Sequence, residues 1–356
     1  MNRKICFLVD SLSRGGAEKL VANLSIPLAE EGVSIYIVSM NNVIDYKFKG
    51  TLFNFGEIKE THSSWVSLIK FKNFFVNHNF DLIIDHRVRD VFIKEMLLSR
   101  FVFRKQKVVY CVHSYKLSFY FSFLKMPWLA KLPHVKKRKY VVVSRGIQQL
   151  LKERLDLKSH VIYNFLPKDL NLRQSEVFGD NRGKYILAVG RLTGIKQFDK
   201  LIVCYSQSIL PSKHIKLIIL GDGEEHKSLK TLIMKLNLEE KISLLPFRNN
   251  PYPIIQEAKV VVLTSKFEGF PMVLVEALGL NTPVIAYDCK SGPSEIIDDG
   301  LNGILVENQN ESKLVKALNK MVDQSFYNKL TPQKGLERFS EEKVVQDWMN
   351  ILESEI

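Results

Sequence analysis

Residues 266–277 read KFEGFPMVLVEA and place two glutamates, Glu268 and Glu276, eight positions apart. The β-branched run at residues 259–265, KVVVLTS, precedes them and predicts a buried parallel strand. A helix is expected from Pro271 onward, because proline is favoured in the first turn of a helix. The first glutamate therefore lies in the loop between a strand end and a helix N-terminus. Open α/β sheets bind ligands at such loops, and the free amides of the helix attract phosphates.

The second glutamate is expected further along the same helix. Eight residues span about 12 Å of helix, so Glu276 could reach a different part of an extended ligand than Glu268 does. This arrangement suits a nucleotide-sugar, with Glu268 at the sugar and Glu276 at the ribose. The alternative for Glu268 is a helix N-cap, worth about 1 kcal/mol. The alternative for Glu276 is a helix residue that faces solvent.

Apolar runs that predict strands alternate with helical patterns along the whole chain. The runs lie at residues 5–10, 33–39, 81–85, 107–112, 140–144, 161–163, 185–189, 215–220, 242–245, 260–264, 284–286 and 303–306. Alternating strands and helices predict parallel sheets with right-handed crossovers. The expected fold class is α/β, with two Rossmann-like domains that face a cleft.

The length of 356 residues fits two domains joined by a linker. We expect an N-terminal domain at residues 1–170 and a polar linker at residues 171–183. The domain that binds the nucleotide-sugar is expected at residues 184–338. Residues 339–356 predict a separate amphipathic C-terminal helix.

The composition indicates a cytoplasmic protein. Hydrophobic residues make up 46% of the chain, yet we find no uncharged apolar stretch of about 20 residues that would span a membrane. The apolar run after Met1 is too short for a signal peptide. The four cysteines are scattered and form no close pair, which is typical of reduced thiols.

The net charge of +13 comes from the first half of the chain. No acidic residue occurs between Glu95 and Glu153, and residues 116–139 alternate aromatic and aliphatic residues with cations around Trp128. This pattern suits the surface of an anionic membrane. The alternatives are an ordinary core helix for the apolar part and a nucleic-acid patch for the basic part. We find no nucleic-acid-binding module, so no nucleic-acid partner is expected.

Several motifs occur in the order seen in one enzyme family. They are the EGFP run followed by Glu276, the SRGGAE run at residues 13–18, the GRL run at residues 190–192 with Lys196, the GDG run at residues 221–223, and the SGPSEII run at residues 291–297. With these motifs the chain resembles the retaining glycosyltransferases of family 4, which have the GT-B fold. The last motif resembles the form common in bacterial surface-polysaccharide transferases. The resemblance is strong over residues 185–305 and weak over residues 40–110.

Two cations, Arg191 and Lys196, follow the first strand of the second half, and we expect them to stabilise a leaving group. Arg191 and Lys196 would offset the negative charge that develops on a nucleoside diphosphate. The alternative is a pair of solvated loop charges. We find no Asp-x-Asp motif to hold a divalent metal, so no metal and no cofactor are expected.

The first half contributes a glycine loop and a histidine. Gly15 and Gly16 would let a diphosphate and a sugar approach the backbone closely, or would form an ordinary βα turn. His113 follows a strand and, in the resembled family, the matching histidine lies opposite the donor sugar. Its alternative is a structural role.

The resemblance assigns two sets of site residues. The catalytic set is Glu268, His113, Arg191 and Lys196. The donor-binding set is Gly15, Gly16, Arg191, Lys196, Phe247, Glu268, Gly269, Phe270, Pro271, Leu274 and Glu276. The resemblance also implies that the N-terminal domain, residues 1–170, binds the acceptor and that the terminal helix crosses back to this domain.

The resemblance implies a retaining, metal-independent transfer of a hexose or N-acetylhexosamine from a UDP-sugar. The acceptor would be a saccharide on a polyprenyl diphosphate, in O-antigen, capsule or lipopolysaccharide biosynthesis. The enzyme would lie on the cytoplasmic face of the plasma membrane. The alternatives are a GT-B epimerase or polymerising synthase, and a non-catalytic partner of another transferase. An NAD-linked dehydrogenase is disfavoured because the G-x-G-x-x-G pattern is missing.

Overall fold

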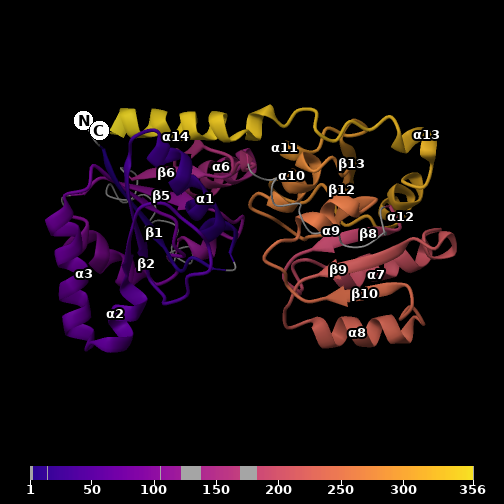
Figure 1. Ribbon diagram of the computed structural model, residues 1–356, viewed down its shortest axis with the longest axis horizontal. Helices are drawn as coiled ribbons and strands as arrows, with labels where there is room; N and C mark the ends of the chain where they lie inside the picture. Colours follow the sequence, from indigo (N-terminus) through magenta and orange to yellow (C-terminus); the bar gives the residue numbers. More distant parts are fainter. Residues whose placement is uncertain (1–2, 14, 105, 122–137, 169–182, 356) are drawn as a thin grey trace. The chain divides into compact units, whose positions relative to one another are not determined.

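The computed structural model describes residues 3–13, 15–104, 106–121, 138–168 and 183–355. The chain divides into two compact units, residues 1–165 with 341–356 and residues 166–340 (Figure 1). Each unit is a parallel sheet with helices on both faces, which confirms the predicted fold class. The predicted linker lies outside the described residues, apart from Gly183.

Within the described part of the chain, no helix is both long enough and apolar enough to span a bilayer.

The first unit contains a seven-stranded parallel sheet. In spatial order the strands are β3 (Thr51–Asn54), β2 (Ser34–Ser39), β1 (Lys4–Val9), β4 (Leu82–Asp85), β5 (Val108–Val112), β6 (Lys139–Val142) and β7 (His160–Val161). The strand order reverses between β1 and β4, which is the topological switch point where ligands bind in such sheets. The edge strand β3 was not predicted from the sequence.

Two hydrophobic cores cover the two faces of this sheet. The helices and helical turns are α1 (Gly16–Glu30), α2 (Phe55–Thr61), α3 (Ser64–His78), α4 (Phe92–Leu97), the π-helical turn η1 (Leu98–Val102), the 3-10 turn η2 (Leu117–Phe119), α6 (Arg145–Leu155) and α14 (Glu341–Glu355). The α1 and α14 helices pack on one face, and α3 and η1 pack on the other.

The C-terminal helix α14 lies beside α1 in the first unit (Figure 1). Its residues Val344, Trp348 and Leu352 are at most 2% exposed and share a core with the strands. The Trp348 ring lies 6.1 Å from the ring of His86, at the end of β4. The last residues of the chain are thus part of the core of the first unit.

The second unit contains a six-stranded parallel sheet. In spatial order the strands are β10 (Ile242–Leu245), β9 (Lys216–Leu220), β8 (Tyr185–Val189), β11 (Val260–Leu263), β12 (Val284–Tyr287) and β13 (Gly303–Val306). Its switch point lies between β8 and β11. The β-branched composition of these strands follows from burial on both faces of the sheet.

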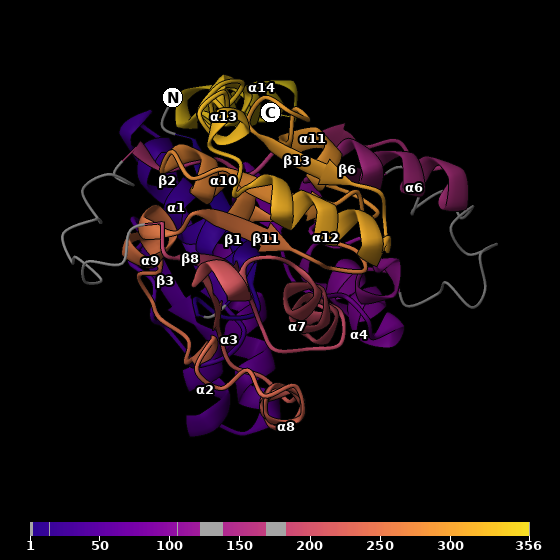
Figure 2. The same cartoon turned by 90° about the vertical axis from the view of Figure 1, so that its right-hand side faces the viewer.

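The helices of the second unit cover this sheet, with α7 and α12 packed against each other (Figure 2). The α-helices are α7 (Phe198–Gln207), α8 (His226–Lys235), α9 (Tyr252–Glu257), α10 (Met272–Gly279), α11 (Pro293–Ile296), α12 (Glu311–Lys320) and α13 (Gln324–Tyr327). The 3-10 turns are η5 (Pro211–Lys213) and η6 (Glu337–Phe339).

We predict that Trp348→Ala lowers the free energy of unfolding by about 3–5 kcal/mol, because it leaves a large cavity in the core of the first unit. The matched control is Trp65→Ala, since Trp65 is 77% exposed and its loss should change stability by about 0.5 kcal/mol or less. Urea denaturation followed by circular dichroism measures both variants. Equal stability of the two would show that α14 does not contribute to the core.

Candidate active site

Two loops meet at the switch point of the second sheet. They are residues 190–197, which follow β8, and residues 264–271, which follow β11. Parallel neighbours place their carboxyl ends at the same edge, so these loops leave the sheet side by side. The Thr264 hydroxyl fixes them together by donating to the carbonyl of Lys196 at 2.9 Å.

An ion pair joins the two loops across 72 residues of sequence. One oxygen of Glu268, Oε1, accepts a hydrogen bond from Lys196 Nζ at 2.6 Å and one from Ser265 Oγ at 2.5 Å. The Lys196 and Glu268 side chains are 21% and 14% exposed, so both charges lie at the surface edge rather than deep in the core. Glu268 does not cap the helix, whose N-cap residue is Pro271 and whose first residue is Met272.

A tight turn at Ser291 and Gly292 supports the loop that carries Glu268. The Ser291 hydroxyl donates to the carbonyl of Gly269 at 2.9 Å. Gly292 has a φ of 101°, and a Cβ at this position would lie 2.4 Å from Cδ of Pro271. Only glycine fits there, so the SGP motif is required by the backbone of the neighbouring loop.

Two predicted donor-binding residues have side chains in the core. Phe270 is 7% exposed and packs against Phe339, with 5.3 Å between the ring centroids. Leu274 is fully buried. A ligand at this edge could therefore meet only backbone atoms of these residues.

Glu276 is buried in helix α10, at 7% exposed surface. Its Oε1 accepts a hydrogen bond from the Tyr252 hydroxyl at 3.3 Å, from the adjacent helix α9. The alternative that Glu276 faces solvent is therefore wrong. Tyr252 was not singled out from the sequence, because nothing in its local pattern shows that α9 and α10 are neighbours.

The glycine loops after β8 and β9 touch each other. A Cβ on Gly221, whose φ is 149°, would lie 2.0 Å from the carbonyl oxygen of Gly190. This close approach places the exposed Arg191 at the same edge as the ion pair. Phe247 is also near this edge, since its amide donates to Asp222 Oδ2 at 3.2 Å and its side chain is 44% exposed.

The two predicted donor-binding glycines of the first unit, Gly15 and Gly16, lie at the start of α1. Gly15 is the N-cap residue of α1 with a φ of −119°, and Gly16 is the first helical residue. A Cβ on Gly16 would meet no described atom within 4 Å, so there is open space beside this turn. An ordinary βα turn explains the backbone, and contact with a donor stays a prediction.

His113 forms a pair with His86 at the carboxyl ends of β4 and β5. His86 Nδ1 and His113 Nε2 lie 2.9 Å apart, and the rings stack with 5.0 Å between centroids. His113 Nδ1 is buried and has no hydrogen-bond partner among the described residues. His86 was missed from the sequence, since only the adjacency of β4 and β5 brings the two rings together.

Two family models match this chain in succession. The model for glycosyltransferase family 4 matches residues 14–170. The model for glycosyl transferases group 1 matches residues 172–341. The chain belongs to the family 4 glycosyltransferases.

Two bacterial relatives align with this glycosyltransferase over 98% of its length and 99% of their own. It is 29% identical over 370 residues to N-acetylgalactosamine-N,N'-diacetylbacillosaminyl-diphospho-undecaprenol 4-alpha-N-acetylgalactosaminyltransferase of Campylobacter jejuni. It is 28% identical over 360 residues to the amylovoran biosynthesis glycosyltransferase AmsD of Erwinia amylovora. The protein is thus a glycosyltransferase of polysaccharide biosynthesis, as predicted.

Solved structures show the same fold over the full chain. HepE of Anabaena, in complex with UDP and glucose, matches with a TM-score of 0.75 at 21% identity, covering 99% of this chain and 100% of HepE. TarM of S. aureus matches with a TM-score of 0.77 at 15% identity, covering 98% and 99%. The fold of the glycosyltransferase is GT-B, as predicted.

A buried ion cluster fixes the segment that carries His86. Arg87 is 1% exposed and donates to both oxygens of Asp85, at 2.9 and 2.8 Å, and to Glu95 at 3.1 Å. Burial alone would raise the pKa of Asp85, but the arginines outweigh it and hold this pKa below its usual value. Burial prevails at Glu95, whose pKa is raised despite Arg87. The glycosyltransferase thus holds a charged, paired cluster directly after β4.

Arg89 completes this arrangement. Its guanidinium lies 5.2 Å from the ring centroids of both Tyr110 and Tyr120 and donates to the carbonyl of Cys111 at 2.8 Å. The DHRVR run at residues 85–89, which follows an apolar strand, was the available sequence signal for this cluster.

One group of described residues has the atoms to bind a metal. Potential ligand atoms of His86, Cys111 and His113 all lie within 4.8 Å of one another. Burial raises the pKa of the Cys111 thiol, and the nearby Arg89 is positively charged, so the surroundings oppose a cation. The absence of a metal from the reaction stays a prediction.

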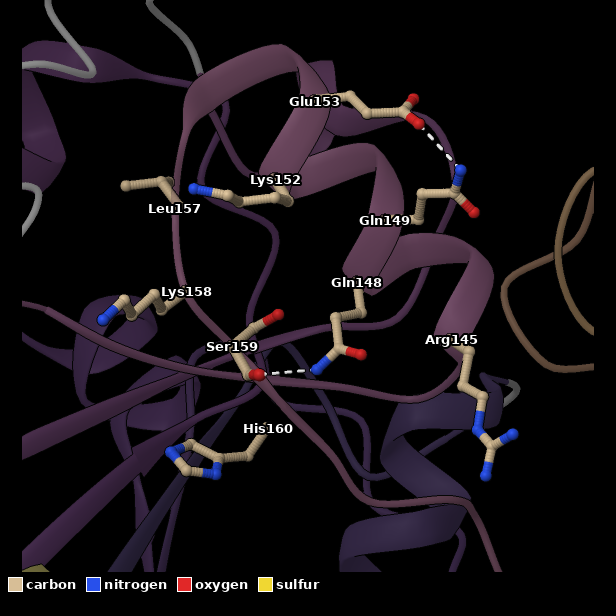
Figure 3. A pocket seen from close by; sticks show the side chains of 9 residues that line it. All are labelled: Arg145, Gln148, Gln149, Lys152, Glu153, Leu157, Lys158, Ser159 and His160. Atoms are coloured by element: carbon tan, nitrogen blue, oxygen red, sulfur yellow. Dashed lines mark hydrogen bonds between the residues drawn. The ribbon is translucent and has the colours of Figure 1, made fainter.

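An open hollow lies on the first unit between α6 and the segment that leads into β7 (Figure 3). Its lining residues are Arg145, Gln148, Gln149, Lys152, Glu153, Leu157, Lys158, Ser159 and His160. The side-chain amide of Gln148 donates to the carbonyl of Ser159 at 2.7 Å. None of the predicted site residues lines this hollow, so it is separate from the predicted donor site.

We predict that acid destabilises the first unit. Burial lowers the pKa of His113 to about 3, with a contribution from Arg89, and lowers the pKa of His86 well below its usual value. Above about pH 6.5 both histidines are neutral in the folded and the unfolded chain. Below it, the unfolded chain binds protons that the folded chain does not, so the free energy of unfolding falls by up to about 1.4 kcal/mol per pH unit for each histidine.

The measurement is urea denaturation at several pH values between about 4 and 7, with tryptophan emission as the signal of unfolding. All three tryptophans belong to the first unit. His113→Asn should reduce the slope of stability against pH by about one proton. A wild-type slope in His113→Asn would mean that His113 titrates normally in the folded protein.

Proposed function

We propose that this glycosyltransferase transfers a hexose or N-acetylhexosamine from a UDP-sugar, with retention of anomeric configuration and without a metal. The observation that carries the proposal is the Lys196–Glu268 ion pair at the switch point of the second sheet. It places a cation and a carboxylate at the carboxyl edge, where α/β sheets bind nucleotides.

The second unit offers a separate group for each part of such a donor. Glu268 lies at the loop, where a sugar hydroxyl can donate to its second oxygen, Oε2, while Lys196 and Ser265 donate to Oε1. Glu276 is buried further along α10 and suits the ribose hydroxyls. The exposed Arg191 and the ammonium of Lys196 suit the diphosphate. The complex of HepE with UDP and glucose, which has the same fold, supports a uridine nucleotide.

The chemistry needs charge stabilisation at the leaving group. The bond between the anomeric carbon and the β-phosphate oxygen breaks, and a bond to the acceptor hydroxyl forms on the same face of the sugar. The acceptor proton passes to the departing phosphate oxygen. Lys196 and Arg191 stabilise the charge that develops on the diphosphate. Because the acceptor hydroxyl attacks the face from which the phosphate leaves, we assign no enzymic nucleophile, and because the phosphate takes the proton, no enzymic base is needed.

We propose that the acceptor is a saccharide carried on a polyprenyl diphosphate. The name of the Campylobacter jejuni relative gives a diphospho-undecaprenol acceptor, and that relative aligns over nearly the full length of both chains. An acceptor of this kind lies in a bilayer, so we further propose that the enzyme is peripheral on the inner face of the plasma membrane. The excess of basic residues in the first half supports attraction to anionic lipid.

We predict that Lys196→Ala and Glu268→Ala each lower kcat at least about a hundredfold, because each removes a charged group from the reacting centre. The matched control is Lys200→Ala. It removes an ion pair of the same unit, in which Lys200 Nζ lies 3.1 Å from Glu311 Oε1. Turnover is measured as UDP release with a membrane-lipid extract, and folding is checked by circular dichroism. Wild-type turnover in either site variant would remove that residue from the mechanism.

The donor is identified by thermal shift with UDP-, GDP- and ADP-sugars in the presence of a chelator. Stabilisation by one UDP-sugar, with UDP released only when the lipid acceptor is present, is the expected result. NMR of the early product then gives the anomeric configuration. Stabilisation by a GDP- or ADP-sugar alone would overturn the choice of nucleotide, and a product of inverted configuration would overturn retention.

A further inference from the structure

Helix α3 has two apolar faces, although one is enough to pack it. Phe71, Phe74 and Phe75 are at most 8% exposed and belong to the core of the first unit. A second set is exposed, with Trp65 at 77%, Leu68 at 46%, Ile69 at 55% and Val76 at 60%. Their spacing of three, four and eleven residues from Trp65 places them on one side of the helix, away from the core face.

The next helical segment has the same property. Across α4 and η1, Ile93 is 65% exposed, Met96 46%, Leu97 45% and Phe101 60%. Their spacing again aligns them along one side. The inward residues Leu98 and Val102 share a core with α3, and α3 and η1 pack against each other. We call the two exposed sets together the α3–α4 surface, and both helices are labelled in Figure 2.

The α3–α4 surface is also basic. Exposed Lys70 and Lys72 lie on α3, and exposed Lys94, Arg100 and Arg104 lie on α4, on η1 and directly after it. Residues 61–80 contain no acidic residue. Glu95, the one acid in α4, is turned inward to Arg87 and is 13% exposed. The exposed acids of the adjoining segments are Glu57 and Glu60 on α2, which packs against α3, and Asp90 before α4, so the five exposed cations outnumber them.

We infer that the α3–α4 surface binds the surface of an anionic lipid bilayer. Apolar side chains at the acyl boundary and cations at the headgroups are the two contributions that hold interfacial helices. Exposed apolar surface of this kind marks an interaction site in a soluble protein. A symmetric pairing of two copies would bring Lys72 and Arg100 near like charges, which opposes a dimer through this surface.

This inference deepens the proposed function, since it names the surface through which the enzyme would reach a lipid-carried acceptor. It also differs from the sequence-based prediction. That prediction placed membrane contact at residues 116–139, of which residues 122–137 lie outside the described residues. The α3–α4 surface comes from a different part of the chain, residues 65–104.

Flotation with vesicles tests the inference without any need for catalysis. The probes are vesicles of phosphatidylcholine alone and of phosphatidylcholine with phosphatidylglycerol. The triple variant Trp65→Ser, Ile69→Ser and Phe101→Ser should bind anionic vesicles at least tenfold more weakly than the wild type. The matched control is Val43→Ser, Ile209→Ser and Met234→Ser, at sites 40–54% exposed, which should bind as the wild type does.

The charge contribution is tested separately. Lys72→Gln with Arg100→Gln should remove most of the preference for anionic vesicles, while Lys230→Gln with Lys235→Gln, also exposed, should keep it. In a Trp128→Phe background, Trp65 is the exposed tryptophan and Trp348 the buried one. A blue shift of the emission on adding anionic vesicles would place Trp65 at the lipid.

Unchanged vesicle binding in the triple variant would overturn the inference. Loss of vesicle binding in Trp128→Phe, without a blue shift of the Trp65 emission, would also overturn the inference. A change in sedimentation mass of the triple variant without a change in vesicle binding would instead assign the surface to a second copy. Turnover with a water-soluble acceptor analogue tests the proposed transferase separately from membrane binding. It should be the same in the triple variant and the wild type.

Discussion

The parallel pairing of β8 with β11 is the constraint on which the candidate site depends. The chain runs 71 positions from Val189, at the end of β8, to Val260, at the start of β11, yet the carboxyl ends of the two strands share one edge. Only that adjacency brings Lys196 within 2.6 Å of Glu268. The ion pair, the Ser265 hydroxyl and the turn at Gly292 then hold the loop ahead of α10 in one conformation. A preorganised charged edge of this kind stabilises developing charge without reorganisation.

The first unit repeats this arrangement with different chemistry. Its switch point lies between β1 and β4, and the segment after β4 is fixed by the Asp85–Arg87 ion pair, which is almost fully buried. A buried pair of this kind depends on complete hydrogen bonding, which Arg87 satisfies through Asp85 and Glu95. The cluster holds His86 beside His113, and burial keeps both rings neutral at physiological pH.

Strand identity and the loop at residues 266–277 were predictable from sequence, because β-branched runs and proline or glycine punctuation are local signals. The partners of the site residues were not. Tyr252 with Glu276 and His86 with His113 depend on which elements are neighbours, and that is decided by the order of strands. The second apolar face of α3 was also missed, since the sequence does not show which of the apolar side chains of a helix pack in the core and which stay exposed.

Hydrogen–deuterium exchange with a UDP-sugar tests most directly whether the charged edge of the second unit is the donor site. The account predicts slower exchange of amides in residues 190–197 and 268–277 when the donor is bound, and no such change in Lys196→Ala or Glu268→Ala at the same donor concentration. Protection confined to the first unit, or equal protection in the wild type and both variants, would contradict the assignment of this edge as the donor site.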